Sequence, residues 1–251
     1  MTRTFEVIPA IDLRAGRCVR LLRGDFAAET HYGDDPVAMA RRWQDEGATR
    51  LHVVDLDGAA RGERTQGSVI AAICRALSIP VQVGGGLRTI DSIRDVLDAG
   101  AERAILGTAA VRDPAVLDAA CRLFPGRIVA GIDQRGGRVA TEGWLDEEAR
   151  QDAVAVARRA AAAGCVAIVY TDIERDGTRE GAALEATVTF AAEHSVPVIV
   201  SGGVAGPDDV RRARAAFDRG ANLAGVIAGR ALYEGDLVLA EAVFLARGEG
   251  C

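Results

Sequence analysis

Short apolar segments alternate with longer helix-forming segments along the whole chain, and this alternation constrains the fold more than any other feature. The short segments are rich in Val and Ile and have the length of buried parallel strands, whereas the longer ones are rich in Ala, Arg and Glu. The pattern occurs eight times without a linker. It predicts strands at residues 5–11, 50–55, 80–83, 103–106, 127–132, 166–170, 197–201 and 224–228.

Helices are predicted between the strands and after the last one. Their starts carry capping residues, such as Thr89 and Asp113 followed by Pro114, and their ends carry Gly, as at Gly100 and Gly164. The predicted helices span residues 36–46, 67–77, 89–99, 113–123, 147–163, 184–194, 207–218 and 237–246.

Eight strand–helix units in 251 residues predict one α/β domain, a single (β/α)8 TIM barrel in which a parallel sheet closes on itself. Aromatic residues make up only 4% of the chain, so the core must consist mainly of Val, Ile, Leu and Ala, as in strands buried on both faces. An open doubly wound sheet is the alternative. It is disfavoured because the turn after the first strand lacks the Gly-x-Gly-x-x-Gly pattern of that fold.

The second half of the chain repeats features of the first. The segment around Asp12, IPAIDLRAGR, is similar to the segment around Asp133, VAGIDQRGGR. Further along, Gly85-Gly86 matches Gly202-Gly203, and Gly107 matches Gly229, in the same order and at similar offsets. We therefore predict two similar half-barrels, at about residues 1–123 and 124–251, related by a pseudo-twofold axis.

Composition excludes several classes of protein. All thirty basic residues are Arg, so the Lys that Schiff-base enzymes and P-loops require is absent. The net charge is −6 and no basic run contains interleaved aromatics, which argues against nucleic-acid partners. No cluster has the spacing of metal ligands. We expect no metal and no cofactor.

The chain has the features of a cytoplasmic protein. Its five Cys residues are far apart and form no CxxC motif, which suits a reducing compartment. Asp12 and Arg14 come too early for the apolar stretch of a signal peptide. No uncharged apolar run reaches 18 residues, so no membrane span is predicted. We expect a monomer.

Glycines follow two pairs of neighbouring strands, at the strand ends where barrels carry their active sites. Glycine lets backbone amides approach an anion, and a helix N-terminus favours it electrostatically. A small molecule with a phosphate at each end is therefore the predicted ligand, although tight strand–helix turns would also explain the glycines. The candidate phosphate ligands are Gly85, Gly86, Gly107 and Thr108 on one side, and Ser201, Gly202, Gly203, Gly229 and Arg230 on the other.

Two carboxylates, Asp12 and Asp133, occupy equivalent positions in the repeat and face each other across the mouth of the predicted barrel. Carboxylates between two phosphate sites point to general acid–base chemistry on the middle of a long substrate. Helix capping is the alternative for each Asp.

Several residues are weaker candidates. Thr171 is placed to hydrogen-bond a ligand hydroxyl, and Trp144 is placed to stack on a planar ring. Asp176 stands in an Asp-Gly turn signal, so a turn role competes with a functional one. Arg20 is a candidate phosphate partner, and His52 lies within a strand, either in the core or at the mouth.

Eight stretches, which cover essentially the whole chain, resemble the motifs of the ProFAR isomerase family of histidine biosynthesis. The resemblance implies an Amadori rearrangement of an N-linked aminoaldose to an aminoketose, ProFAR to PRFAR, without metal or organic cofactor. The stretches are IPAIDLRAGRCVRLLRGD, VVDLDGA, VQVGGGLR, AILGTAAV, GIDQRGGRVATEGW, TDIERDGT, VSGGV and VIAGRALYEG.

The resemblance also implies roles for the site residues. Asp12 in AIDLR would be the general base that removes the C2′ proton. Asp176 in RDGT and Asp133 in GIDQR would be the candidates for the general acid that protonates the furanose ring oxygen, with Asp176 favoured and Asp133 a required helper. Thr171 would support the substrate, and Trp144 would stack on its imidazole carboxamide ring.

Three rival readings stay open. The related cyclase has a Lys eight residues after the first Asp, where this chain has Arg20, and needs a glutaminase partner. The bifunctional isomerase that also uses phosphoribosylanthranilate has an Arg two residues before the loop Trp, where this chain has Glu142. A negative charge there would repel the anthranilate carboxylate. A non-catalytic phosphosugar-binding barrel is the third reading.

Overall fold

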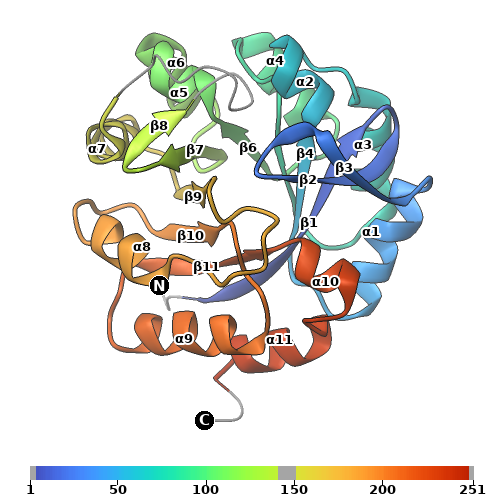
Figure 1. Ribbon diagram of the computed structural model, residues 1–251. Coiled ribbons are helices and arrows are strands. Elements are labelled where there is room, and N and C mark those ends of the chain that lie inside the picture. The colour runs from blue at the N-terminus through green and yellow to red at the C-terminus, as the bar shows by residue number, and fades with distance from the viewer. Residues whose placement is uncertain (1–3, 141–150, 249–251) are drawn as a thin grey trace.

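A closed parallel barrel forms the centre of the computed structural model, which describes residues 4–140 and 151–248. Each strand pairs in parallel with the next, and β11 pairs with β1 to close the ring (Figure 1), which confirms the predicted α/β barrel. The barrel strands are β1 (Glu6–Arg14), β4 (Leu51–Asp55), β5 (Val81–Gly84), β6 (Arg103–Leu106), β7 (Ile128–Arg135), β9 (Ala167–Asp172), β10 (Val198–Ser201) and β11 (Leu223–Ala228).

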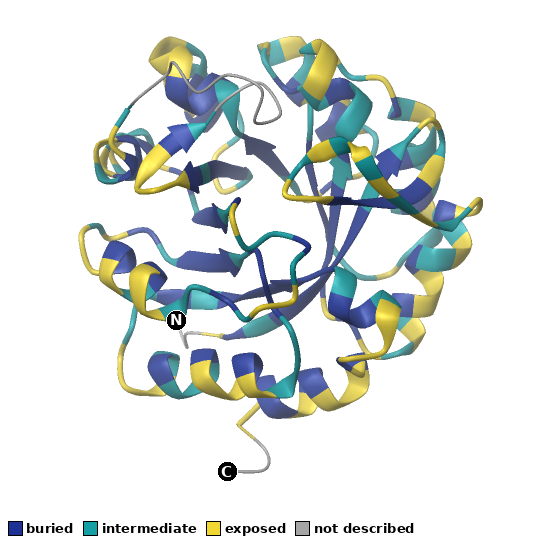
Figure 2. Ribbon diagram, viewed as in Figure 1, coloured by how far each residue is buried: buried dark blue, intermediate teal, exposed yellow. Residues whose placement is uncertain are grey.

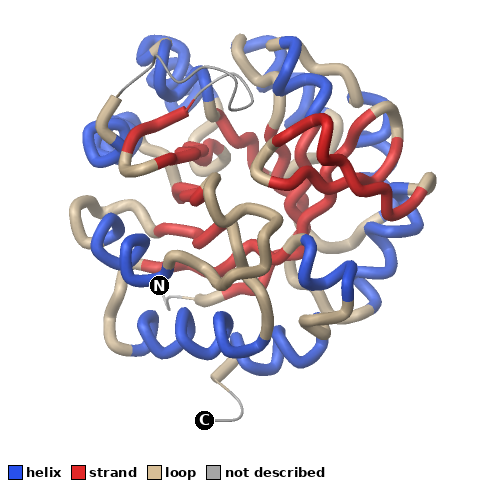
Figure 3. The backbone as a smooth tube through the Cα atoms, in the orientation of Figure 1, coloured by secondary structure: helices blue, strands red, loops and turns tan. Residues whose placement is uncertain are grey.

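Helices surround the barrel on its outer face (Figure 3). Capping residues set several helix starts as predicted; Thr89 forms a capping box with Ser92, and the Asp113 carboxylate accepts from the Val116 amide. Within the described residues, no helix combines the length and the apolar character that crossing a membrane requires. The outer helices are α1 (Pro36–Asp45), α3 (Gly67–Ala76), α4 (Ile90–Asp98), α6 (Pro114–Leu123), α7 (Ala153–Ala163), α8 (Leu184–Ala191), α9 (Pro207–Asp218) and α11 (Leu239–Ala246).

Two predicted helix bounds were wrong. Helix α7 begins at Ala153, later than predicted, because the Asp152 carboxylate caps it by accepting from the Val154 amide. Residues 147–150 of that prediction lie outside the described part of the chain. Helix α8 ends at Ala191 rather than at residue 194, with Ala192 as its C-cap.

Two apolar layers hold the barrel together. The outer layer lies between strands and helices and contains the large side chains Trp43, Leu51 and Ile93, all fully buried (Figure 2). The inner layer fills the barrel itself, so the barrel is a packed core and not a pore. Its residues are Ile8, Ala10, Ile105, Val129, Ala167, Val169, Ile199 and Ile227.

Short elements at the carboxyl ends of the strands were not predicted. Strands β1 and β7 continue past the barrel because each pairs with an antiparallel neighbour, β2 (Arg17–Leu22) and β8 (Arg138–Ala140). Strand β2 also pairs with β3 (Asp25–Gly33) to form a hairpin. The short helices that follow barrel strands are α2 (Leu56–Arg61), α5 (Thr108–Arg112) and α10 (Arg230–Glu234).

Candidate active site

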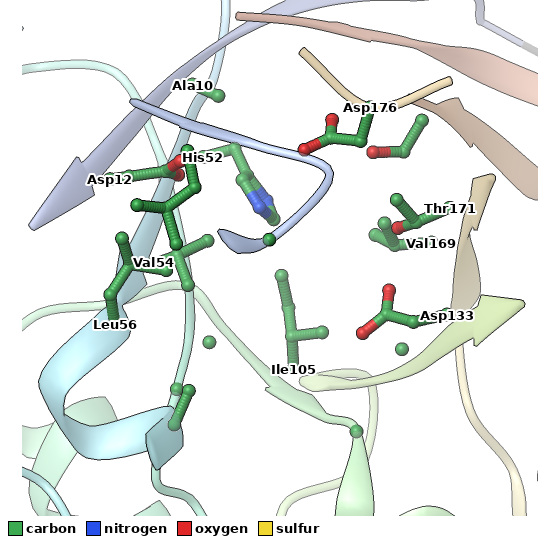
Figure 4. Close-up of a pocket in the computed structure, with 18 of the residues that line it drawn as sticks. Ala10, Asp12, His52, Val54, Leu56, Ile105, Asp133, Val169, Thr171 and Asp176 are labelled. Atoms are coloured by element: carbon green, nitrogen blue, oxygen red, sulfur yellow. The ribbon is translucent and has the colours of Figure 1, made fainter. Parts of the chain in front are cut away.

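A large open cavity lies at the carboxyl ends of the barrel strands, as the fold predicts. Its volume is about 1230 Å³, including the open mouth. Figure 4 shows Asp12 on one side of this cavity, with Thr171 and Asp133 on the opposite side and Asp176 between them. The predicted site residues that line it are Asp12, Arg20, Gly85, Gly86, Gly107, Thr108, Asp133, Thr171, Asp176 and Ser201.

A smaller hollow of about 300 Å³ shares four lining residues with the cavity: Arg20, Asp176, Ser201 and Ile227. It collects the other glycine loops, which follow β10 and β11. Among its lining residues are the predicted Gly202, Gly203, Gly229 and Arg230. The two groups of predicted phosphate ligands therefore flank the aspartates.

The hairpin carries Arg20 into the site. Asp12 pairs with Val19 in the β1–β2 ladder, and this register brings Arg20 beside Asp12 and Asp176. The Arg20 Nη1 atom lies 2.9 Å from Oδ2 of Asp12, and Nη2 lies 4.0 Å from Oδ1 of Asp176. Arg20 is only 7% exposed. A buried cation thus sits between the two carboxylates.

Burial shifts both carboxyl groups toward the protonated form. It raises the pKa of Asp12 above its ordinary value, and the adjacent Arg20 guanidinium offsets part of that rise. Burial also raises the pKa of Asp176, to about 6; Arg20 opposes the rise, while the charges of Asp12 and Asp133 add to it. The tighter ion pair belongs to Asp12, so Asp12 is held as a carboxylate more firmly than Asp176.

The opposite wall comes from neighbouring strands β7 and β9. Asp133 and Thr171 are register partners in this parallel pair, so their side chains stand next to each other at the cavity edge. Strand β8 pairs with the same end of β7, with Ala140 opposite Asp133. Thr171 is largely buried and lines the cavity.

Two glycines have equivalent environments in the two halves of the barrel. A Cβ atom on Gly85 would overlap the backbone carbonyl of Asp55, and one on Gly202 would lie 2.5 Å from the carbonyl oxygen of Asp172. Both glycines have positive φ angles, 97° and 89°. Asp55 ends β4 and Asp172 ends β9. Only glycine fits where each loop crosses the end of the preceding strand.

Gly107 and Gly229, which match each other in the sequence repeat, have different surroundings. A Cβ atom on Gly107 would point into open space, whereas one on Gly229 would overlap the Arg20 guanidinium. Arg230 does not extend freely into the smaller hollow. Its Nη1 atom donates to the Gly177 carbonyl at 3.0 Å, and Nε lies 3.5 Å from Glu234. Gly229 therefore leaves room for Arg20, and Arg230 holds the loop that carries Asp176.

Sequence reasoning missed part of the lining. Leu21, Gly24 and Phe26 reach the cavity from the hairpin, and Arg179 lines the smaller hollow. The alternating apolar residues of 17–22 would have indicated a strand after β1. His52, left open between core and mouth, lines the cavity. Trp144 and Glu142 lie outside the described residues.

Comparison with known proteins assigns the family. The family described as "histidine biosynthesis protein" matches residues 6–238. A relative from Picosynechococcus sp. is 52% identical over 239 residues, which is 95% of this chain and 92% of the relative. One from Hahella chejuensis is 49% identical over 237 residues, 94% of this chain and 96% of the relative. One from Desulfosudis oleivorans is 49% identical over 242 residues, which is 96% of this chain and 94% of the relative.

All three relatives carry the name 1-(5-phosphoribosyl)-5-((5-phosphoribosylamino)methylideneamino)imidazole-4-carboxamide isomerase. The similarity spans both halves of the barrel and every loop that contributes a described site residue. The chain therefore belongs to the histidine biosynthesis protein family.

Proposed function

We propose that this protein is a ProFAR isomerase, which converts ProFAR to PRFAR in histidine biosynthesis by an Amadori rearrangement. The observation that carries the proposal is that acidic groups stand between two glycine-rich rims, one lining the cavity and the other lining the smaller hollow beside it. ProFAR, the substrate in the relatives' name, carries a phosphate at each end. Its reacting aminoaldose would lie between the rims, beside Asp12 and Asp176.

The reaction needs one acid and one base, and the two buried carboxyl groups suit these roles. Asp176, with a pKa of about 6, holds a proton in a fraction of molecules near neutral pH and donates it to the furanose ring oxygen. The ring C1′–O bond breaks as the nitrogen lone pair forms a protonated Schiff base. Asp12, kept ionised by Arg20, then removes the C2′ proton to give an enolamine. Tautomerisation of the enolamine, with a proton added at C1′, yields the aminoketose.

Asp133 and Thr171 would act from the opposite wall. Their adjacent positions on β7 and β9 suit hydrogen bonds to substrate hydroxyls. The raised pKa of Asp176 and its contact with the Arg20 side of the cavity favour Asp176 over Asp133 as the general acid. Asp133 would then be a required helper that orients the opened sugar and destabilises the ionised form of Asp176.

The glycine-rich rims would hold the two phosphates. One rim comprises Gly85, Gly86, Gly107 and Thr108, and Thr108 is the first residue of α5. The other comprises Ser201, Gly202, Gly203 and Gly229, with Arg230 opening α10. Backbone amides exposed by glycine would bind phosphate oxygens on each rim. One chain supplies all of these groups, so we propose that a monomer in the cytoplasm is the active form.

The test is turnover of ProFAR and, in parallel, of phosphoribosylanthranilate by the purified protein without added metal. Product formation is followed by chromatography, with the Asp12→Asn variant as the control for contaminating isomerase. Turnover of ProFAR alone supports the dedicated isomerase. Turnover of both substrates keeps the family reaction and overturns the specificity argument from Glu142. A folded protein that turns over neither would sink the proposal.

A further inference from the structure

Two polar side chains interrupt the apolar interior of the barrel. The inner layer is otherwise built from residues such as Ile8, Ala10 and Ile105. On β4 and β5, however, His52 and Gln82 are register partners, and both are buried. Gln82 is completely inaccessible, so it does not contact a ligand itself. His52 lines the active-site cavity, where Figure 4 shows its ring extending from the Asp12 side toward the centre.

The contact between them determines which ring nitrogen carries the hydrogen. Nε2 of Gln82 lies 3.0 Å from Nδ1 of His52. An amide NH2 group only donates, so Nδ1 must accept, and the hydrogen of a neutral ring then resides on Nε2. In the observed orientation the amide donates one hydrogen to Nδ1 and Oε1 has no partner, whereas the reverse orientation would leave both amide hydrogens unpaired.

The ring is also held neutral. Burial and, to a lesser extent, the positive charge of Arg20 together lower the pKa of His52 to about 3. An imidazolium here would face the Arg20 guanidinium and would compete with it for the Asp12 carboxylate. A neutral ring with hydrogen on Nε2 avoids both effects and still offers one donor.

We propose that Gln82 is a positioning residue for the isomerisation: it fixes His52 in the Nε2–H tautomer, so that the cavity presents an uncharged donor to a sugar hydroxyl oxygen. The proposal rests on the proposed function. Ala10 and His52 are register partners, and so are Asp12 and Val54 two residues further along the same strands. The hydroxyl concerned would therefore lie close to the carbon that Asp12 deprotonates. A neutral donor there polarises the oxygen without lowering the basicity of Asp12.

The tautomer can be read directly by nitrogen NMR of protein labelled with 15N-histidine. The chain has three His residues, and replacing His31 and His194 in turn assigns the His52 signals by elimination. We expect Nδ1 of His52 to resonate as an unprotonated, pyridine-type nitrogen and Nε2 as a protonated one near neutral pH. A protonated Nδ1 in the wild-type protein would overturn the proposal without any change to Gln82.

Kinetics then test whether the contact matters for turnover. Gln82→Met keeps the side-chain length but removes the donor, and we expect kcat/KM for ProFAR to fall by roughly threefold to tenfold, the value of one hydrogen bond. In a His52→Asn background the same substitution should cost nothing further. Gln44→Met is the matched control, because Gln44 accepts from Ser78 at the other end of the barrel.

The outcomes separate this proposal from the proposed function. Wild-type turnover with an unchanged Gln82→Met variant, or additive losses in the double variant, would overturn the role of Gln82 alone. Absence of wild-type turnover would overturn the proposed function and, with it, the catalytic role of Gln82. An accepting Nδ1, a loss in Gln82→Met and no further loss in the double variant together support the proposal.

Discussion

One guanidinium lies near both carboxyl groups for which we propose opposite protonation states. Arg20 lies 2.9 Å from Asp12 and 4.0 Å from Asp176, so its charge favours ionisation of Asp12 more than that of Asp176. Both groups are buried, and burial alone would push both toward the protonated form. The asymmetry of this contact therefore supports the proposed division between Asp12 as base and Asp176 as acid.

The base role is tested by Asp12→Asn. The amide keeps the shape of the side chain but cannot accept the C2′ proton, so we expect kcat to fall at least about 100-fold. Affinity for ProFAR, measured by calorimetry, should change much less, since the proposal places Asp12 beside the reacting carbon and away from the phosphates. A variant that loses affinity but keeps kcat would assign Asp12 to binding.

Asp176→Asn tests the acid through stability as well as turnover. The pKa of this carboxyl is about 6 in the folded protein against about 4 in the unfolded chain, so the folded state binds the proton more tightly. Its stabilising contribution is complete below pH 4 and is lost as pH rises through about 6. At pH 7–8 the Asn variant should therefore be more stable than wild type, by about 1–3 kcal/mol.

Urea denaturation between pH 4 and pH 8 provides the measurement. The free energy of unfolding of the wild type should fall relative to that of Asp176→Asn as pH rises, while the variant loses isomerase activity. Parallel stability curves for the two proteins would mean that burial does not perturb Asp176 in this way.

At the scale of the element, the hairpin β2–β3 contacts the loop that carries Asp176, the proposed acid. The Arg23 amide donates to the Asp176 carbonyl at 3.0 Å, and Nε of Arg23 donates to the Glu174 carbonyl at 3.0 Å. Gly177 fits against the hairpin only because it lacks a side chain; a Cβ atom there would lie 2.6 Å from the Leu21 carbonyl oxygen. The hairpin after β1 and the loop after β9 therefore form one unit.

Gly177→Ala should break that unit. The added methyl group must push the loop that carries Asp176 away from the hairpin, so we expect kcat/KM to fall more than about tenfold. Gly126→Ala is the matched control, because Gly126 has a similar φ angle of 79°, against 72° for Gly177, but open space around its Cβ position. It should show the strain penalty of about 1–2 kcal/mol in stability with little loss of activity. Equal effects of the two substitutions would contradict the role of the hairpin.

This hairpin also marks the limit of what the sequence predicted. The eight barrel strands were predicted because buried parallel strands are continuous apolar runs. Strand β3 alternates between exposed and half-buried residues and carries no such run. It pairs with β2 across the Arg23-Gly24 turn, whose φ angles are 52° and 74°, and Arg-Gly is not one of the Asn-Gly or Asp-Gly pairs that indicate such a turn in a sequence. Asp176 was a weak candidate because Asp-Gly alone indicates a turn. The pairing of Arg20 with Asp12 was not predicted at all.

At the scale of the whole molecule, the two ends of the barrel carry different clusters of side chains. The cavity occupies the carboxyl ends of the strands, whereas an ion network stands at their amino ends. Arg50, just before β4, is buried; its Nε lies 3.1 Å from Glu6 of β1, and its Nη1 contacts Glu102, just before β6. The network links the neighbouring strands β1 and β4 to β6, which lies two positions beyond β4, so it holds more than one strand pair together.

Arg50→Met tests this division. Loss of the cation leaves Glu6 and Glu102 without their shared partner, and we expect a loss of about 1–3 kcal/mol in stability. The loss should stay below that for a fully buried pair, because Glu102 is about half-exposed. Arg211→Met is the control, since Arg211 pairs with the exposed Asp208 and Glu241 and should cost less than about 1 kcal/mol. Below its unfolding temperature Arg50→Met should keep the wild-type kcat/KM; lost activity with unchanged stability would show that the two ends are coupled.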